Sequence, residues 1–438
     1  MAVEVAALSN LRAIAAATAR GDSDVQRFYN NSVVFLTGGS GFLGKQLIEK
    51  LLRLVCFKLG RYIIILIDTY RNLPKNPVSS RNGNKIKVIE GDVAELKLGI
   101  KDEDWRTLIE EVNVIFHVAA TTRFDETLRT ATLINVRGTR EALLLGKTCK
   151  NLKYVVFNEL PYHLSQILSL SSSTGRRLCT DQNSKLNFFL INWPNTYTFT
   201  KSISEELVRT MTDGLPICIV RPAIVLCTYR EPAPGWVDVS LCFFQILLGI
   251  ALGVLHVIHV NPATSIGTIP CDYVNNAIIV AGRETSTSQL RGGNNTKIYT
   301  VSPTIQNPVT WSVYYCFALC TSSKSIFMVV SFLAHTIPAC MADFVCLLLG
   351  KQRRYFKLAN KMNKMSSVLN FFLHNEWTFL DHNLKKLFNS LSNQDKTIFN
   401  FDIANINWTE FIITSFLGIN NYHRKLTNNV IFIFCWFS

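Results

Sequence analysis

The chain has 438 residues, 48% of them hydrophobic and 17% charged, which excludes a largely disordered or collagen-like protein. This length indicates two or three domains. Lysine and arginine number 45 against 31 acidic residues, and the net charge of +14 favours an anionic partner: nucleic acid, an acidic membrane surface or a phosphate-rich small molecule. The 12 cysteines show no zinc-ligand spacing, and without a signal peptide we expect reduced thiols that face the cytosol.

Short β-branched runs alternate with helical stretches after an expected N-terminal tail over residues 1–30. The expected strands are 33–36, 62–67, 86–89, 112–118, 154–157 and 217–220, and the expected helices include 45–54, 139–149 and 200–212. This βαβ order predicts an α/β fold with a Rossmann-type parallel sheet, over a domain at 31–300. Within it, the polar stretch 283–297 is expected to be an exposed connection.

The last third of the chain has a different pattern. After a connection at 301–325, we expect a mainly helical C-terminal domain over 326–438. Its first part, 326–349, is almost continuously apolar, although His335, Pro338 and Asp343 interrupt it. A buried helix and a membrane contact both explain this run, and the apolar tail at 430–437 is too short to span a bilayer.

A glycine-rich loop follows the first expected strand and opens the first helix. It consists of Thr37, Gly38, Gly39, Ser40, Gly41, Phe42, Leu43 and Gly44. Gly38 permits a tight turn, Gly41 lets the backbone approach a pyrophosphate, and Gly44 allows close packing of the helix. Because a helix N-terminus favours anions, this loop predicts dinucleotide binding, with the glycine spacing of extended short-chain dehydrogenases/reductases.

Two acidic residues follow the next two strands. Asp68 ends the second strand, where an acid usually accepts from the ribose 2′-hydroxyl and favours NAD. Arg71, three residues later, would instead favour the 2′-phosphate of NADP. Asp92 follows the third strand and is placed to meet the adenine.

Tyr197 and Lys201 form a Tyr-x3-Lys pair on an expected helix. Residues four apart share a helix face, so both side chains point into one site. A phenol is a poor acid or base at neutral pH, and a nearby ammonium should lower its pKa. The pair therefore predicts a proton donor, Tyr197, with Lys201 also binding the nicotinamide ribose.

Together with segments between and after them, these motifs resemble the fatty acyl-CoA reductases, especially those of arthropods. The matching blocks are 24–29, 114–126, 134–141, 193–201, 221–222, 234–238, 269–272, 375–379, 399–402 and 407–408, the last three in the family's "male sterility" domain. The resemblance implies that Asn135 joins Tyr197 and Lys201 in the catalytic group. It also implies that Val93, Ala119, Ala120 and Pro222 border the cofactor.

The resemblance further implies a reaction and a setting. NADPH would reduce a long-chain acyl-CoA to a primary alcohol through an aldehyde, and the positive charge suits the phosphates of CoA. No nucleic-acid partner is expected. A cytosol-facing membrane of the peroxisome or endoplasmic reticulum would suit the lipid substrate.

One departure from the family concerns the end of the fifth strand. Glu159 stands where the family has a serine, and Leu160 where it has a threonine. An ionised carboxylate cannot donate to a developing oxyanion and would repel it, so we expect weak activity or none. Hydroxyls of residues 169–173 are another source of a donor. The alternatives are a non-catalytic homologue that binds nucleotide or acyl-CoA, and a nucleotide-sugar epimerase or hydroxysteroid dehydrogenase; the C-terminal blocks argue against the last two.

Overall fold

A seven-stranded parallel sheet, in the order β10-β6-β5-β4-β1-β2-β3, forms the centre of the molecule. The computed structural model describes residues 2–55, 63–68, 85–160, 193–212, 214–237, 242–251, 255–290, 296–314 and 318–422. The strands are β1 (Val34–Thr37), β2 (Ile63–Asp68), β3 (Ile86–Gly91), β4 (Val114–His117), β5 (Tyr154–Asn158), β6 (Ile217–Pro222) and β10 (Lys297–Val301). Every expected strand is present, so the Rossmann-type fold is confirmed.

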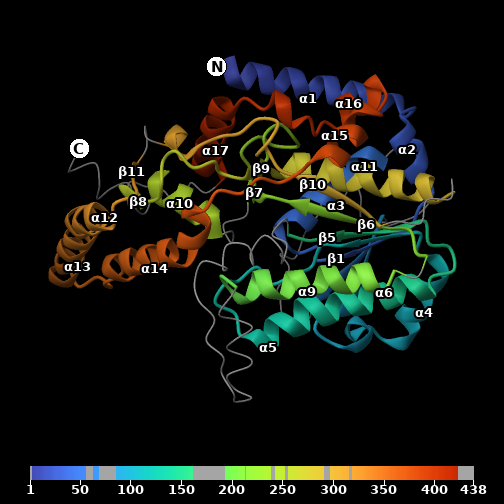
Figure 1. Cartoon of the computed structure of the whole chain (residues 1–438), viewed down its shortest axis with the longest axis horizontal. Coiled ribbons are helices and arrows are strands. Elements are labelled where there is room, and N and C mark those ends of the chain that lie inside the picture. Colours follow the sequence, from blue (N-terminus) through green and yellow to red (C-terminus); the bar gives the residue numbers. More distant parts are fainter. Residues whose placement is uncertain are drawn as a thin grey trace.

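Helices cover both faces of this sheet (Figure 1). One layer holds α2 (Asp24–Tyr29), α3 (Phe42–Val55) and α11 (Cys271–Leu290), and the other holds α4 (Asp102–Glu111), α5 (Leu128–Ala131), α6 (Gly138–Thr148) and α9 (Thr196–Thr210). Neighbouring strand residues alternate between the two cores: Val34 and Leu36 pack in one, Val33 and Phe35 in the other. This double burial explains why the strands read as continuous apolar runs.

The N-terminal residues do not form the expected tail. Residues Ala2–Arg20 are helix α1, which packs against α16 (Asn393–Ile398), and α2 follows it. Ile14 and Ala17 are buried on this contact, as is Val25 in α2. The small side chain of Ala17 allows close packing of the helices at this contact.

Residues 283–290 of the polar stretch are not part of the expected connection, because α11 continues through them to Leu290. Its hydroxyl side chains turn back onto the helix. Thr285 Oγ1 donates to the Ala281 carbonyl at 2.7 Å, and Thr287 Oγ1 to the Arg283 carbonyl at 3.1 Å. These bonds satisfy the threonine hydroxyls within the helix, whereas in other sequences such hydroxyls often favour a loop.

The C-terminal region is mainly helical, as expected. It contains α12 (Lys324–Ser331), the π-helix η5 (Phe332–Thr336), α13 (Ile337–Leu348), α14 (Tyr355–His374), α15 (His382–Asn389), α16, the 3-10 turn η6 (Ile403–Asn405) and α17 (Trp408–Tyr422). The segment expected as a connection holds the 3-10 turn η4 (Trp311–Tyr314) and β11 (Leu319–Thr321). Strand β11 pairs with β8 (Val257–His259), near α10 (Cys242–Ala251), while β7 (Ile224–Leu226) pairs with β9 (Thr268–Pro270).

Candidate active site

The candidate site lies at the carboxyl edge of the parallel sheet, where the strand order reverses between β1 and β4. Thr37 ends β1, Asp68 ends β2, and Pro222 ends β6. Ala119 and Ala120 follow β4, and Asp92 follows β3. The fold thus brings these predicted cofactor residues to one edge. The side chain of Asp68, and all of Arg71, lie outside the described residues.

The glycine loop crosses the end of β1 with little room for side chains. Gly38 has a φ of +75°, and a Cβ there would lie 2.7 Å from the Ala119 nitrogen. A Cβ on Gly44 would lie 2.2 Å from the Gly38 carbonyl oxygen, so α3 starts directly against the loop. Since α3 begins at Phe42, its free N–H groups point toward the loop formed by Gly39, Ser40 and Gly41. This cradle suits a pyrophosphate, although its occupancy remains a prediction.

The loop after β3 is shaped by Asp92 itself. Its Oδ1 accepts the Ala94 N–H at 2.8 Å, and its own N–H donates to the Leu98 carbonyl at 2.8 Å. Val93 is partly buried against the core beneath the sheet. The turn is therefore fixed without a ligand, and the predicted contact of Asp92 with adenine is not tested by it.

Helix α9 carries the catalytic pair that the sequence predicts. Asn195 caps its N-terminus by accepting the Thr198 N–H at 2.9 Å. The Tyr197 ring stacks on Phe124, with centroids 5.8 Å apart. Lys201 Nζ donates to the Asn158 carbonyl, at the end of β5, at 2.7 Å.

Asn135 contacts α9 through Thr200. It lies in the π-helix η3 (Thr132–Arg137), a local widening that is frequent at functional sites. Its Nδ2 donates to Thr200 Oγ1 at 2.9 Å, and its Oδ1 accepts the Thr121 N–H at 2.9 Å. Asn135 is thus held rigidly between the loop after β4 and the helix of Tyr197 and Lys201.

Glu159 is directed into the protein, toward α9. It is 2% exposed; its Oε2 lies 3.2 Å from Lys201 Nζ, and its Oε1 accepts from Ser204 Oγ at 3.0 Å. Burial raises the pKa of Glu159, although Lys201 and Ser204 act in the opposite direction. The residue therefore influences the site through Lys201, rather than through the direct approach to a substrate oxygen that its sequence position suggested.

The expectation that Lys201 lowers the pKa of Tyr197 is wrong for this arrangement. Burial, and then the charge of Glu159, raise the pKa of the Tyr197 phenol. The physical reason is that the Lys201 ammonium is already engaged by Glu159 and by the Asn158 carbonyl. The phenol is therefore held protonated, as a proton donor rather than a base.

A buried polar chain that the sequence reasoning missed links this helix to the glycine loop. Thr37 Oγ1 lies 2.9 Å from His117 Nδ1, whose Nε2 lies 3.3 Å from Thr139 Oγ1. Thr139 is 2.7 Å from Ser204 Oγ, which bonds Glu159. Burial, and then the charge of Lys201, lower the pKa of His117 to about 3. Helical spacing could have predicted these two hydroxyl residues. Thr139 lies one turn after Asn135, and Ser204 lies two turns after Tyr197, so each shares a helix face with a predicted site residue.

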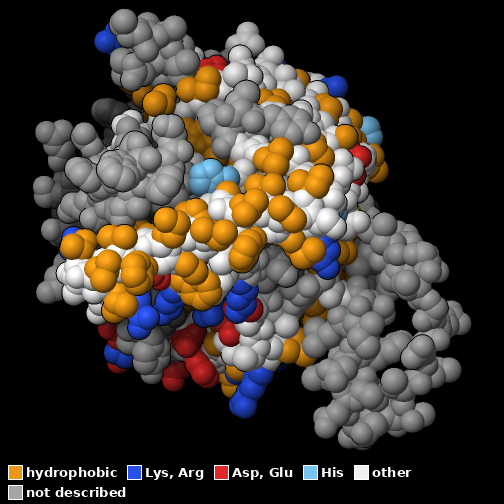
Figure 2. Space-filling model, turned by 90° about the vertical axis from the view of Figure 1, so that its left-hand side faces the viewer, with side chains coloured by type: hydrophobic (Ala, Val, Ile, Leu, Met, Phe, Trp, Pro, Cys, Tyr) orange, Lys and Arg blue, Asp and Glu red, His pale blue; other side chains and the backbone are white. Residues whose placement is uncertain are grey.

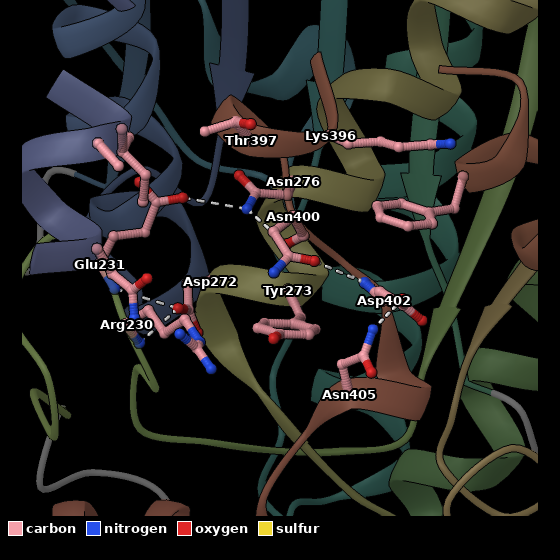
Figure 3. Close-up of a pocket in the computed structure, with 14 residues that line it drawn as sticks. Arg230, Glu231, Asp272, Tyr273, Asn276, Lys396, Thr397, Asn400, Asp402 and Asn405 are labelled. Atoms are coloured by element: carbon pink, nitrogen blue, oxygen red, sulfur yellow. Dashed lines mark hydrogen bonds between the residues drawn. The ribbon is translucent and has the colours of Figure 1, made fainter. Parts of the chain in front are cut away.

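A cavity of about 300 Å³ lies elsewhere, between α1, α11 and the α16 region (Figure 3). Its polar groups bond to one another. Glu231 pairs with Lys50 at 2.5 Å and Arg53 at 2.8 Å, and Asn276 donates to Glu231 Oε1 at 3.1 Å. Asp272 accepts three backbone N–H bonds, one of them from Arg230, at 2.8–3.2 Å. We interpret this cavity as a polar junction between the two parts of the chain, since no predicted site residue lines it.

Two family models match the chain, both described as male sterility protein: an NAD-binding model over residues 36–278 and a second model over 334–425. The chain is 32% identical to "Fatty acyl-CoA reductase wat" of Drosophila melanogaster, over 92% of this chain and 86% of that protein. The chain belongs to the fatty acyl-CoA reductase family. It is also 30% identical to human "Fatty acyl-CoA reductase 2", over 92% of this chain and 87% of the relative.

Solved structures share the fold of this fatty acyl-CoA reductase family member. The reductase domain of a nonribosomal peptide synthetase from Mycobacterium tuberculosis matches with a TM-score of 0.61 and 17% identity, over 89% of this chain and 92% of that one. The terminal reductase domain of the myxalamid pathway matches with a TM-score of 0.59 and 18% identity, over 91% and 92%. At this identity these structures show the shared fold; the assignment as a reductase with an NAD-binding domain rests on the family models and the curated relatives.

Proposed function

We propose that the protein reduces a long-chain acyl-CoA to a primary alcohol through an aldehyde, with NADPH as the electron source. One observation carries the proposal: Tyr197 and Lys201 lie on α9, where Asn135 bonds Thr200, in a chain of fatty acyl-CoA reductase sequence. Both family models match the chain, which supports a reductase rather than an isolated nucleotide-binding domain.

The chain's own residues have distinct parts in this proposal. The cradle at Gly38 and Gly44, with the N-terminus of α3, would hold the pyrophosphate. One bound NADPH would supply a hydride to the thioester carbonyl, from which CoA leaves as the thiol, and a second NADPH would supply the hydride that reduces the resulting aldehyde. Tyr197, whose phenol is protonated at neutral pH, would give its proton to the alkoxide oxygen, although the raised pKa makes it a weaker acid.

A second candidate function is an impaired reductase that binds its ligands without efficient turnover. The pairing of Lys201 with Glu159 favours it, because the lysine is held toward the carboxylate. In the productive arrangement Lys201 would instead bind the cofactor ribose and support proton transfer. Residues 169–173, the other source of a hydroxyl, lie outside the described residues.

We further propose a two-part division near residue 300, with the N-terminal part binding the cofactor and the C-terminal part helping to bind the acyl chain. Phe124, whose ring stacks on Tyr197, also contacts Phe372 of α14, with centroids 5.5 Å apart. A cytosol-facing membrane of the peroxisome or endoplasmic reticulum is the setting that we propose for this lipid substrate.

The test is a product assay on the full chain. Long-chain acyl-CoA is incubated with NADPH or NADH, and aldehyde and alcohol are measured by mass spectrometry. Alcohol formed faster with NADPH supports the proposal, whereas cofactor binding without either product supports the impaired form. Cofactor preference is tested separately by binding to the unaltered protein and to Asp68→Ala. Tighter binding of NADH by the unaltered protein would contradict the NADPH assignment.

A further inference from the structure

One continuous helical stretch, Lys324–Leu348, is long and apolar enough to cross a membrane, yet only 17% of its apolar window is buried. It is built from α12, the π-helix η5 and α13, which lie at one end of the molecule (Figure 1). Because most of it is exposed, it is not the buried core helix that one interpretation of the sequence suggested.

The buried face of this stretch is mostly polar or small. It comprises Ser331, His335, Ala339, Asp343 and Cys346, at intervals of three or four residues. His335 Nε2 accepts the His256 N–H at 2.8 Å, and Ser331 lies 3.1 Å from His335 Nδ1. Asp343 accepts the Arg354, Tyr355 and Phe356 N–H groups at 2.8–3.0 Å, and so caps α14. His335 and Asp343, which interrupt the apolar run, therefore form hydrogen bonds with the rest of the protein.

The outward face is apolar along its whole length. An exposed stripe runs through Ile326, Val329, Leu333, Ile337, Met341, Phe344 and Leu348, again at intervals of three or four. Phe344 is 61% exposed and Leu348 70% exposed. Figure 2 shows hydrophobic side chains gathered in a band across this end of the molecule. A water-facing helix has the opposite arrangement, with polar residues outside, so this face is built for a non-aqueous neighbour.

Positive charge borders the band. Lys351, Arg353, Arg354 and Lys357 follow α13 directly, and all are exposed. Lysine and arginine side chains gather along one edge of the band in Figure 2. Between Lys324 and Leu349 the only acidic residue is Asp343, which is 9% exposed and faces inward. An apolar face with a basic border matches the acyl and headgroup layers of an anionic bilayer.

We propose that α12, η5 and α13 form a monotopic docking surface for an anionic lipid bilayer, with the outward stripe in the acyl layer and the basic border among the headgroups. The stretch does not cross the bilayer in this proposal, because its other face stays bonded to His256 and α14. The inference gives a specific surface to the membrane association put forward above, and it stands or falls independently of catalysis.

The position of the surface also relates to the site. Helix α14 packs against α13 and carries Phe372, which contacts Phe124, which in turn stacks on Tyr197. Helix α14 therefore connects the proposed docking surface with the aromatic residues beside Tyr197.

Flotation with vesicles, without substrate, tests the proposal. The full chain is mixed with vesicles of phosphatidylcholine alone or with phosphatidylserine added. The variant V329Q/L333Q/F344Q should bind both at least about tenfold more weakly, because apolar burial drives interfacial binding. The variant R353Q/R354Q should lose at least about tenfold on anionic vesicles only. The matched control V88Q/L96Q replaces exposed apolar residues of the nucleotide-binding part and should bind like the unaltered chain.

Three results would overturn the proposal. The first is failure of the unaltered chain to bind anionic vesicles, and the second is an equal loss in the control. The third is normal vesicle binding by V329Q/L333Q/F344Q together with a change from dimer to monomer in sedimentation velocity, which would assign the face to a second copy of the chain. Thermal unfolding of each variant checks that the outward substitutions leave the fold intact.

Discussion

Helix α9 and the stretch α12–α13 both hide polar side chains, but they face different surroundings. In α9 the buried Lys201 and Ser204 bond to Glu159, and the outward face carries Glu206 and Arg209. In α12–α13 the buried Asp343 bonds to backbone, and the outward face is apolar. Buried polar groups therefore do not identify a function by themselves. The opposite face, polar in α9 and apolar in α12–α13, is what separates the two helices and leads to the proposal of a lipid-facing surface.

The largest expected effect concerns the chemical face of α9. Tyr197→Phe keeps the ring on Phe124 but removes the proton, so alcohol formation should fall by about 10²–10⁴-fold. Cofactor affinity should stay nearly unchanged, whereas Lys201→Ala should weaken both turnover and cofactor binding. Turnover is measured as product formed, and cofactor affinity by titration. Full turnover by Tyr197→Phe would mean that another group supplies the proton and that α9 has no catalytic face.

The second effect concerns the pairing of Lys201 with Glu159. Replacing Glu159 by Ser removes the buried carboxylate that engages Lys201, and replacing Leu160 by Thr adds a hydroxyl at the end of β5. One oxyanion donor is worth roughly 10²–10³-fold in rate. We expect at least about a tenfold gain in turnover, if Lys201 is released at the same time.

Glu159→Gln is the matched control, since it removes the charge but adds no hydroxyl. Because the charge of Glu159 raises the pKa of Tyr197, this variant should move the alkaline limb of the pH–rate profile to lower pH. An unaltered chain that already reduces acyl-CoA rapidly would contradict the impairment and would favour a hydroxyl from residues 169–173.

The contrast between these helices also shows what the sequence could predict. The strands and the Tyr-x3-Lys helix followed from local periodicity, which tertiary contacts left unchanged. Two features depended on partners far along the chain: the docking of α1 against α16, and the direction of the Glu159 carboxylate. The apolar run 326–349 was recognised, but its buried face is set by contacts such as those of His335 with His256 and of Asp343 with the start of α14. Contacts between segments that are far apart in the sequence cannot be predicted from the residue pattern of one segment.

A smaller effect concerns the pH dependence of the free energy of unfolding, to which one buried histidine from each region contributes. Burial lowers the pKa of His117 to about 3 and that of His335 to about 4, against an unfolded value near 6.5. Below pH 6.5 the unfolded chain binds protons that the folded chain does not, so the free energy of unfolding falls as pH falls. Each histidine should contribute a slope of about 1.4 kcal/mol per pH unit in that window. Asp272 acts oppositely, because burial raises its pKa to about 6.

Urea unfolding between pH 7 and pH 5 measures these slopes. His117→Gln and His335→Gln should each flatten the pH dependence by the contribution of one group, whatever their effect at neutral pH. The loss should be similar in the two variants, because both histidines are held neutral by burial. An unchanged slope in either variant would show that this histidine is protonated in the folded chain and that its surroundings are wet.

The smallest effects come from two adjacent residues that face opposite ways. Asp343 bonds three N–H groups at the start of α14, so Asp343→Ala should lower the free energy of unfolding by about 1–2 kcal/mol, as loss of a helix cap does. Phe344 is 61% exposed, so Phe344→Gln should change it by less than about 0.5 kcal/mol in water. Denaturant unfolding of both variants without lipid gives the comparison. If Phe344→Gln cost as much as Asp343→Ala, the outward face would pack against protein, and the difference between the two regions would disappear.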